Sequence, residues 1–275
     1  MGALVKKIAG WTGRCCIATV AAIIYVLGGV FLLGDAAVGG GLMYNFAKEG
    51  NIDAVARLLK TGVSPDTSGT LLSMGPALGW LLKSQSSLAA ASADGHTEIV
   101  DLLLKGGASV DKGRRFGPFG SIAIKTPLFL ASEQGHTKVV DLLLEGGASV
   151  DKVGMLGPFG SAMLATPLYA ASEEGHPMVV ELLVKCGASV DKGYTIGPFG
   201  SVISTTPLIA ASEKGRTEIV KLLLEGGANV DEGSTFGPFN LGTPLSMASD
   251  ESHTKVVDLL LKAGATPPSS ASKEL

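Results

Sequence analysis

Four histidines are the residues of this chain best suited to metal chemistry, because imidazole is the commonest metal ligand in proteins. They are His96, His136, His176 and His253. The first three lie 40 residues apart and follow a glycine, whereas the fourth follows Ser252. Residues at one position of successive packed helices lie ~8–10 Å apart, whereas zinc holds its nitrogen ligands at ~2.0 Å. We therefore interpret the histidines as turn residues that bond to the backbone, and we predict no metal site.

Recurring carboxylates could in principle bind calcium or a basic ligand. They are Glu133, Asp141, Glu173, Glu174, Glu181 and Glu213. Lysines alternate with them along the chain, among them Lys138, Lys185, Lys214 and Lys221. Such alternation is typical of a solvated helix face, and this is the interpretation that we adopt.

Sequence motifs for catalysis are absent. The chain has no phosphate-binding GxxxxGK, no HExxH, no CxxC and no GxSxG, each of which places a particular reactive group. Its three cysteines offer no disulfide framework. We therefore predict that the protein is not an enzyme and uses no cofactor.

The charge balance argues against nucleic acid as a partner. Lys and Arg number 22 against 25 Asp and Glu, which gives a net charge of -3. A protein that binds a phosphate backbone needs clustered basic residues to displace counterions, and after residue 14 only Arg114 and Arg115 stand side by side.

A Gly-Pro-Phe turn occurs four times, as FGPFGS (116–121), LGPFGS (156–161), IGPFGS (196–201) and the shorter FGPFN (236–240). Proline and glycine at these places favour a type I turn, and the apolar flanks predict short strands. The apolar residues that recur in it are Phe116, Phe119, Leu156, Phe159, Ile196, Phe199, Phe236 and Phe239. If hairpins lie side by side, these residues form rows that either pack within the protein or remain exposed and bind a partner.

These turns separate the copies of a longer repeat. TPLFLASEQGHTKVVDLLLEGGASVD (126–151) returns with a period of 40 residues, and copies start near residues 41, 86, 126, 166, 206 and 243. Thr-Pro predicts the start of a helix, because threonine caps it and proline fits its first turn. Gly135 predicts its end. A second helix is predicted by the apolar face that Val139, Val140, Leu142, Leu143 and Leu144 would form. Such units must stack to bury their apolar faces.

The pattern TPL…A…GH…VV.LLL..GA.V resembles the ankyrin repeat over residues 41–266. The resemblance implies an all-α ankyrin-repeat solenoid with projecting β-hairpin fingers and a protein-binding role. Two departures stand out. First, the position where the family usually has histidine holds Phe129, Tyr169, Ile209 and Ser246. Second, the period of 40 residues exceeds the usual ~33.

A membrane helix is predicted at residues 15–34, which form 20 residues without a charge. Residues 1–14 form a basic segment before it, so the N-terminus is expected to stay on the side of synthesis. Residues 35–40 would be a linker and residues 267–275 a tail. Ala18, Ala22 and Gly29 share one face of the expected helix and would allow another helix to pack closely. A cleavable signal peptide is the alternative interpretation.

These features together predict a single-pass membrane protein that binds other proteins through its fingers and inner helices. It could be a scaffold or a permanent accessory subunit of a membrane complex. Two alternatives remain, namely a secreted ankyrin effector with a cleaved signal peptide, and a regulatory adaptor or inhibitor of an enzyme.

Overall fold

The computed structural model describes residues 37–66, 68–70, 84–116, 123–156, 162–197, 203–236 and 239–267. The chain divides into two compact units, Met1–Asp35 and Ala36–Leu275, and all described residues belong to the second. Within these ranges, no helix has both the length and the apolar character to cross a membrane. The predicted membrane helix at residues 15–34, with Ala18, Ala22 and Gly29, lies outside the described residues.

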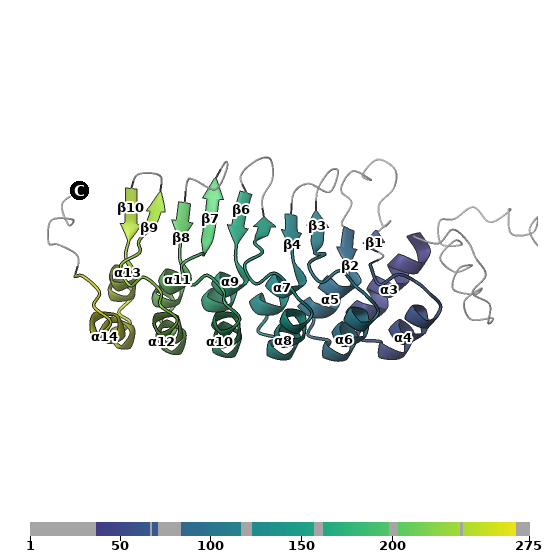
Figure 1. Cartoon of the computed structure of the whole chain (residues 1–275). Helices are drawn as coiled ribbons and strands as arrows, with labels where there is room; N and C mark the ends of the chain where they lie inside the picture. The colour runs from purple at the N-terminus through teal and green to yellow at the C-terminus, as the bar shows by residue number, and fades with distance from the viewer. Residues whose placement is uncertain are drawn as a thin grey trace, which may run out of the picture. The chain divides into compact units, whose positions relative to one another are not determined.

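The described residues form six helix pairs, which stack in two parallel rows (Figure 1). The inner helices are α3 (Ala37–Glu49), α5 (Ser87–Ala93), α7 (Pro127–Glu133), α9 (Pro167–Glu174), α11 (Pro207–Glu213) and α13 (Pro244–Asp250). The outer helices are α4 (Ile52–Lys60), α6 (Thr97–Lys105), α8 (Thr137–Glu145), α10 (Pro177–Lys185), α12 (Thr217–Glu225) and α14 (Thr254–Lys262).

The inner helices begin where the sequence predicts. The Thr126 hydroxyl accepts a hydrogen bond from the Phe129 amide at 3.1 Å, and Pro127 fills the first turn. Ser86 caps α5 in the same way, through the Ala89 amide at 3.1 Å. A serine hydroxyl therefore replaces threonine without loss of the cap.

Helix α3 starts earlier than expected. The sequence assigns residues 35–40 to a linker, whereas α3 begins at Ala37. Glycine disfavours a helix by ~1 kcal/mol per residue, but Met43, Tyr44 and Ala47 of this helix are buried. Burial of these side chains therefore outweighs the unfavourable helix propensity of the three glycines in α3.

Ten short strands extend from the helices. They are β1 (Ser68–Thr70), β2 (Ser84–Ser86), β3 (Arg114–Phe116), β4 (Ala123–Lys125), β5 (Gly154–Leu156), β6 (Ala162–Ala165), β7 (Tyr194–Gly197), β8 (Ile203–Thr205), β9 (Ser234–Phe236) and β10 (Phe239–Gly242). They pair in chain order into one antiparallel sheet. The hairpins expected to project from the all-α solenoid are therefore joined edge to edge into one sheet, because hydrogen bonds link each hairpin to the next.

The main core lies between the two rows of helices. Leu128 of α7 and Val140 and Leu143 of α8 are buried, and their equivalents in the neighbouring pairs belong to the same continuous cluster. No helix pair encloses this cluster by itself, so each pair depends on its neighbours.

A histidine, or in one case an arginine, joins each helix pair after the first to the pair before it. His176 Nε2 lies 3.1 Å from the Glu133 carbonyl oxygen. The same bond links His96 to Lys48, His136 to Ala93 and His253 to Glu213, and Arg216 makes it to Glu174. The interpretation as backbone-bonding turn residues is thus confirmed, and no cluster of three metal-ligating side chains occurs within the described ranges.

Two features of the structure require glycine at position 135. Its φ is +76°, a conformation that other residues adopt at a cost, and a Cβ there would lie 2.5 Å from His176 Nδ1. The imidazole of each pair therefore needs the glycine of the preceding pair. In the last pair Ser252 takes this position, with φ of +61°.

Aspartates form a second row of links between helix pairs. Asp111 accepts hydrogen bonds from the Ser149 amide at 3.2 Å and the Ser149 hydroxyl at 2.7 Å. In the other links a backbone amide donates in the same way to an aspartate: Ser109 to Asp66, Ser189 to Asp151, Asn229 to Asp191 and Thr266 to Asp231. Burial by itself would raise the pKa of Asp111, but the bonds from Ser149 and the nearby Lys152 outweigh it and lower that pKa. This role was not predicted from the sequence, although Asp151 ends the repeat copy at residues 126–151 and an aspartate ends the other copies that have this link.

Gly135→Ala is expected to destabilise the protein more than Gly147→Ala. Both glycines have positive φ, but nothing lies within 4 Å of a Cβ at Gly147. A left-handed alanine costs about 1 to 3 kcal/mol, and Gly135→Ala adds a clash with His176. Urea unfolding followed by circular dichroism measures both losses, and equal losses would show that the imidazole contact contributes nothing.

Asp111→Asn is expected to lower the free energy of unfolding at pH 7 by about 1 kcal/mol, because a charged acceptor is lost. Since the folded pKa is lowered, this stabilisation is complete above the ordinary carboxyl pKa of ~3.9 and is lost as pH falls through the folded value. Urea midpoints of wild type and variant should therefore converge in acid. Asp141→Asn, at an exposed position of α8, is the control, and an equal effect there would contradict the assignment.

Candidate functional site

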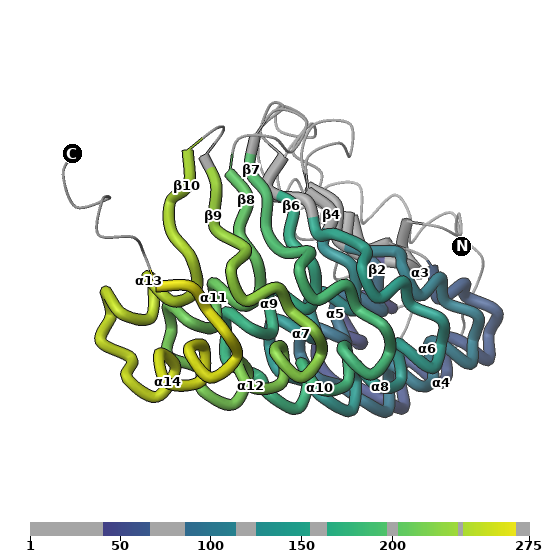
Figure 2. Tube along the Cα trace, turned by 60° about the vertical axis from the view of Figure 1, so that its left-hand side comes forward, coloured from purple at the N-terminus to yellow at the C-terminus, as the bar shows by residue number. Residues whose placement is uncertain are grey.

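The strands and the inner helices together present one continuous face, which we call the inner face. In Figure 2 the strands β6 to β10 project from the ends of the inner helices. The outer helices lie on the other side of the inner helices, away from the strands. The inner face combines both elements that the sequence singles out for partner binding. It is therefore the candidate functional site.

Strand pairing places six apolar residues in one row across the sheet. In order from β5 to β10 they are Leu156, Met163, Ile196, Ile203, Phe236 and Phe239. Each is the register partner of the next, so they form a line perpendicular to the strands. We call this line the apolar row.

The predicted site residues thus fall into three groups. Leu156, Ile196, Phe236 and Phe239 belong to the apolar row, and Phe116 ends β3 opposite Ala123. The turn residues Phe119, Phe159 and Phe199 lie outside the described residues. Among the members whose side chains are described, Ile196 is half-buried and Phe239 is 66% exposed.

The last strand is exposed and also interrupted. Leu241 of β10 is 51% exposed and follows Phe239 by two residues. The register shifts between Asn240 and Gly242, and the Asn240 side chain accepts a hydrogen bond from the Gly242 amide at 2.9 Å. Such a bulge disturbs the free edge of a sheet and hinders further strand pairing.

A second, smaller hydrophobic cluster lies where the strands meet the inner helices. It contains Phe129, Ala165, Tyr169, Ala170 and Ala210, with Tyr194 packed against it. Phe129 and Tyr169 stand where the resemblance leads one to expect histidine. Phe129 packs against Gly154, where an added Cβ would lie 3.1 Å from the ring. The departure from the family pattern therefore builds an apolar layer beneath the sheet.

Two tyrosines stack in this layer, of which Tyr169 is buried and Tyr194 is half-buried. The rings of Tyr169 and Tyr194 stack with centroids 5.4 Å apart at 19°. Burial, and then the nearby charge of Glu173, raise the pKa of both hydroxyl groups. The sequence analysis did not single out Tyr194, and its only signal was a tyrosine at the base of one hairpin.

Charged groups border the aromatic layer. Lys125 Nζ lies 2.7 and 2.9 Å from the two carboxylate oxygens of Glu133, and 5.1 Å from the centre of the Phe129 ring. In the next pair, the pKa of Glu173 is raised, first by burial and then by the charge of Glu174. The carboxylates expected to lie on a solvated helix face are thus partly buried at these two positions.

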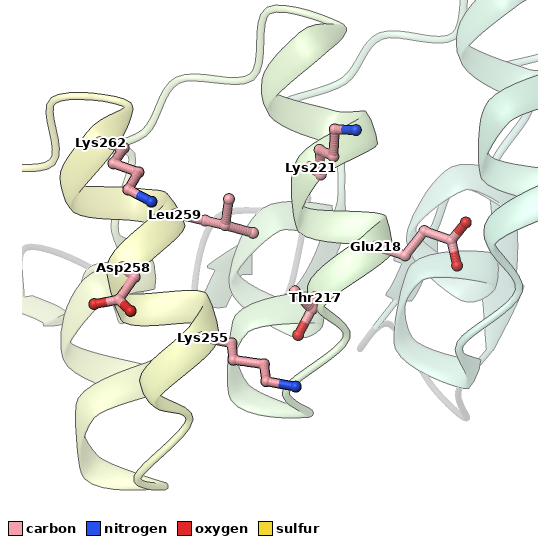
Figure 3. Close-up of a pocket in the computed structure, with 7 residues that line it drawn as sticks. All are labelled: Thr217, Glu218, Lys221, Lys255, Asp258, Leu259 and Lys262. Atoms are coloured by element: carbon pink, nitrogen blue, oxygen red, sulfur yellow. The ribbon is translucent and has the colours of Figure 1, made fainter.

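A pocket of about 480 Å³ lies elsewhere, between the outer helices α12 and α14. It is lined by Thr217, Glu218, Lys221, Lys255, Asp258, Leu259 and Lys262. Figure 3 shows that the carboxylates of Glu218 and Asp258 point away from each other, and the charged groups do not converge on one point. The pocket therefore offers no arrangement of nucleophile and base.

Comparison with known proteins identifies the repeat. A family model described as ankyrin repeats, in three copies, matches residues 87–194 and 196–270. The crystal structure of the human ASB11 ankyrin repeat domain matches with a TM-score of 0.57 and 29% sequence identity, covering 82% of this chain and 85% of that chain. No curated protein matches the sequence.

Phe129→Ala and Phe239→Ala should differ sharply in their effect on folding. Phe129 is 3% exposed, so its removal leaves a cavity and should cost about 3 to 5 kcal/mol. Phe239 is mostly exposed, and its removal should change stability by less than about 0.5 kcal/mol. Urea unfolding of both variants checks this, and a large loss for Phe239→Ala would show that this residue is structural.

Proposed function

The chain belongs to the ankyrin-repeat family, and from that premise we propose that it is a membrane-anchored scaffold or accessory subunit that binds a protein partner through its inner face. Ankyrin repeats are protein–protein interaction modules, and the fold is typically a non-enzymatic scaffold. The membrane attachment, the part played by the fingers and the nature of the complex are our proposals.

The observation that carries the proposal is the apolar row. A single hairpin would hold its apolar residues loosely, because an isolated two-stranded hairpin is marginally stable in water. Pairing of consecutive hairpins instead holds six apolar residues in register over six strands. Exposed apolar groups on a rigid surface are typical of a protein-binding site.

Exposure supports the same surface. Phe239 and Leu241 are two of the five large hydrophobic side chains that are exposed among the described residues. Both belong to the inner face, and the other three, Ile52, Met178 and Leu261, lie on separate outer helices. Among the described residues, exposed large hydrophobic side chains therefore occur on the same element only in β10.

The proposed anchor rests on the sequence of residues 15–34, which is uncharged, and on the basic residues before it. A helix there would attach the repeat array to a bilayer, so that the array would bind its partner at the membrane surface. The N-terminus would remain on the side of synthesis.

The experiment compares the full-length wild type with three variants of it. Each protein is purified from the membrane fraction of its source cells, and the partners that co-purify with it are measured. Phe239→Ser with Leu241→Ser, and Phe119→Ser with Phe159→Ser and Phe199→Ser, should each lose the partner, because apolar contact area is removed. The control variant, Met178→Ser with Leu261→Ser, should retain it. Circular dichroism must show that all variants are folded.

Equal recovery of the partner with all three variants would contradict the proposed role of the inner face. Intact-mass measurement of the same native sample tests the anchor. A mature chain that begins near residues 36–40 would show cleavage and contradict it.

A further inference from the structure

Two neighbouring inner helices carry the same aromatic–carboxylate pair in different surroundings. Phe129 and Glu133 lie four residues apart on α7, and Tyr169 and Glu173 lie four residues apart on α9. Residues at this spacing occupy the same face of a helix. The two pairs can therefore be compared position by position.

In the first pair the chain supplies its own cation. Lys125 at the end of β4 reaches both oxygens of Glu133 and lies over the Phe129 ring. Its side chain is 18% exposed and that of Glu133 is 25% exposed. A partly buried carboxylate is thus neutralised by an ammonium that also contacts an aromatic face.

In the second pair the cation is missing. The position of Lys125 is taken by Ala165, which has no charge. Tyr194 is the register partner of Ala165, and its ring stacks on Tyr169. Two aromatic rings therefore lie next to Glu173 where the first pair has one ring and a lysine.

Glu173 itself is half-buried, and within the described ranges its carboxylate has no hydrogen bond or ion pair. The charges near it are those of Glu174, Glu213 and Glu133, which raise its pKa, and of Lys214, which lowers it. Lys214 lies 3.6 Å from Glu213 instead. Lys125 and Lys214 offset Glu133 and Glu213, whereas no ion pair within the described residues offsets Glu173 or Glu174, so the local charge is negative.

We propose that Glu173, Tyr169 and Tyr194 form a binding site for a basic side chain of the protein partner, with arginine preferred over lysine. The proposal rests on the proposed function, because it names the chemistry that the inner face recognises. Arginine fits best, since its planar guanidinium stacks on aromatic rings and makes paired hydrogen bonds to a carboxylate.

A defined peptide tests the site without knowledge of the partner. The probe is acetyl-Gly-Gly-Arg-Gly-Gly-amide, and the matched control peptide carries citrulline, a neutral isostere, in place of arginine. The chain has four tyrosines, so full-length protein with ¹³C-labelled tyrosine gives a simple NMR spectrum. Tyr169→Phe and Tyr194→Phe assign the two signals of interest.

The arginine peptide should shift the Tyr169 and Tyr194 signals in a saturable way, whereas the citrulline peptide should not. Glu173→Gln should weaken the binding about tenfold, because a charge-assisted bond is lost. Glu181→Gln, at an exposed position of the outer helix α10 that pairs with Lys185, should leave it unchanged. Tyr194→Leu, read from the Tyr169 signal, should also weaken it several-fold.

The site is ruled out if neither tyrosine signal moves, if both peptides shift them equally, or if Glu173→Gln binds as well as wild type. Each of these results leaves the proposed function intact, because that function is judged from co-purification with apolar-row variants. Conversely, a partner that ignores those variants would contradict the proposed function even if the arginine peptide binds.

Discussion

The apolar residues of each helix pair lie buried only because the adjacent pair covers them. Leu143 of α8 is fully buried in a cluster that runs through the whole array. No pair can form this core alone, so stability accumulates from contacts between neighbours. The histidine and aspartate bonds reinforce the same interfaces, since both join side chains of one pair to the backbone or side chains of the next.

The sheet follows from the same stacking. Helix pairs at a constant spacing place their hairpins at a constant spacing, and the longer hairpins of this chain then meet edge to edge. Pairing between hairpins satisfies backbone groups that separate fingers would expose to water. It also gives the surface a fixed register, so that apolar residues from different repeats become neighbours although they are about 40 residues apart in sequence.

Local chemistry was predictable from the sequence, and contacts between repeats were less so. Thr126, Pro127 and Pro177 mark helix starts because caps and proline act within one turn. The role of the histidines could be predicted because their spacing excludes a shared metal. Side-by-side hairpins were one open interpretation of the sequence, but their hydrogen-bonded pairing and register could not be predicted, since both depend on the distance between stacked helix pairs. The stack of Tyr194 on Tyr169 and the reach of Lys125 to Glu133 depend on that geometry too, and sequence spacing does not encode it.

Ser252 makes the C-terminal end of the array differ from its internal positions. In every earlier pair a glycine at this position leaves room for the histidine or arginine of the pair that follows, as Gly215 does for His253. Ser252 carries a Cβ at the corresponding place, and the bulge of β10 interrupts the sheet at the same end of the molecule. A unit inserted within the array would find a glycine at this position, whereas a unit added after α14 would meet a side chain in the helical layer and an irregular edge in the sheet. The C-terminal end of the array is therefore less suited to stacking a further unit than its internal positions are.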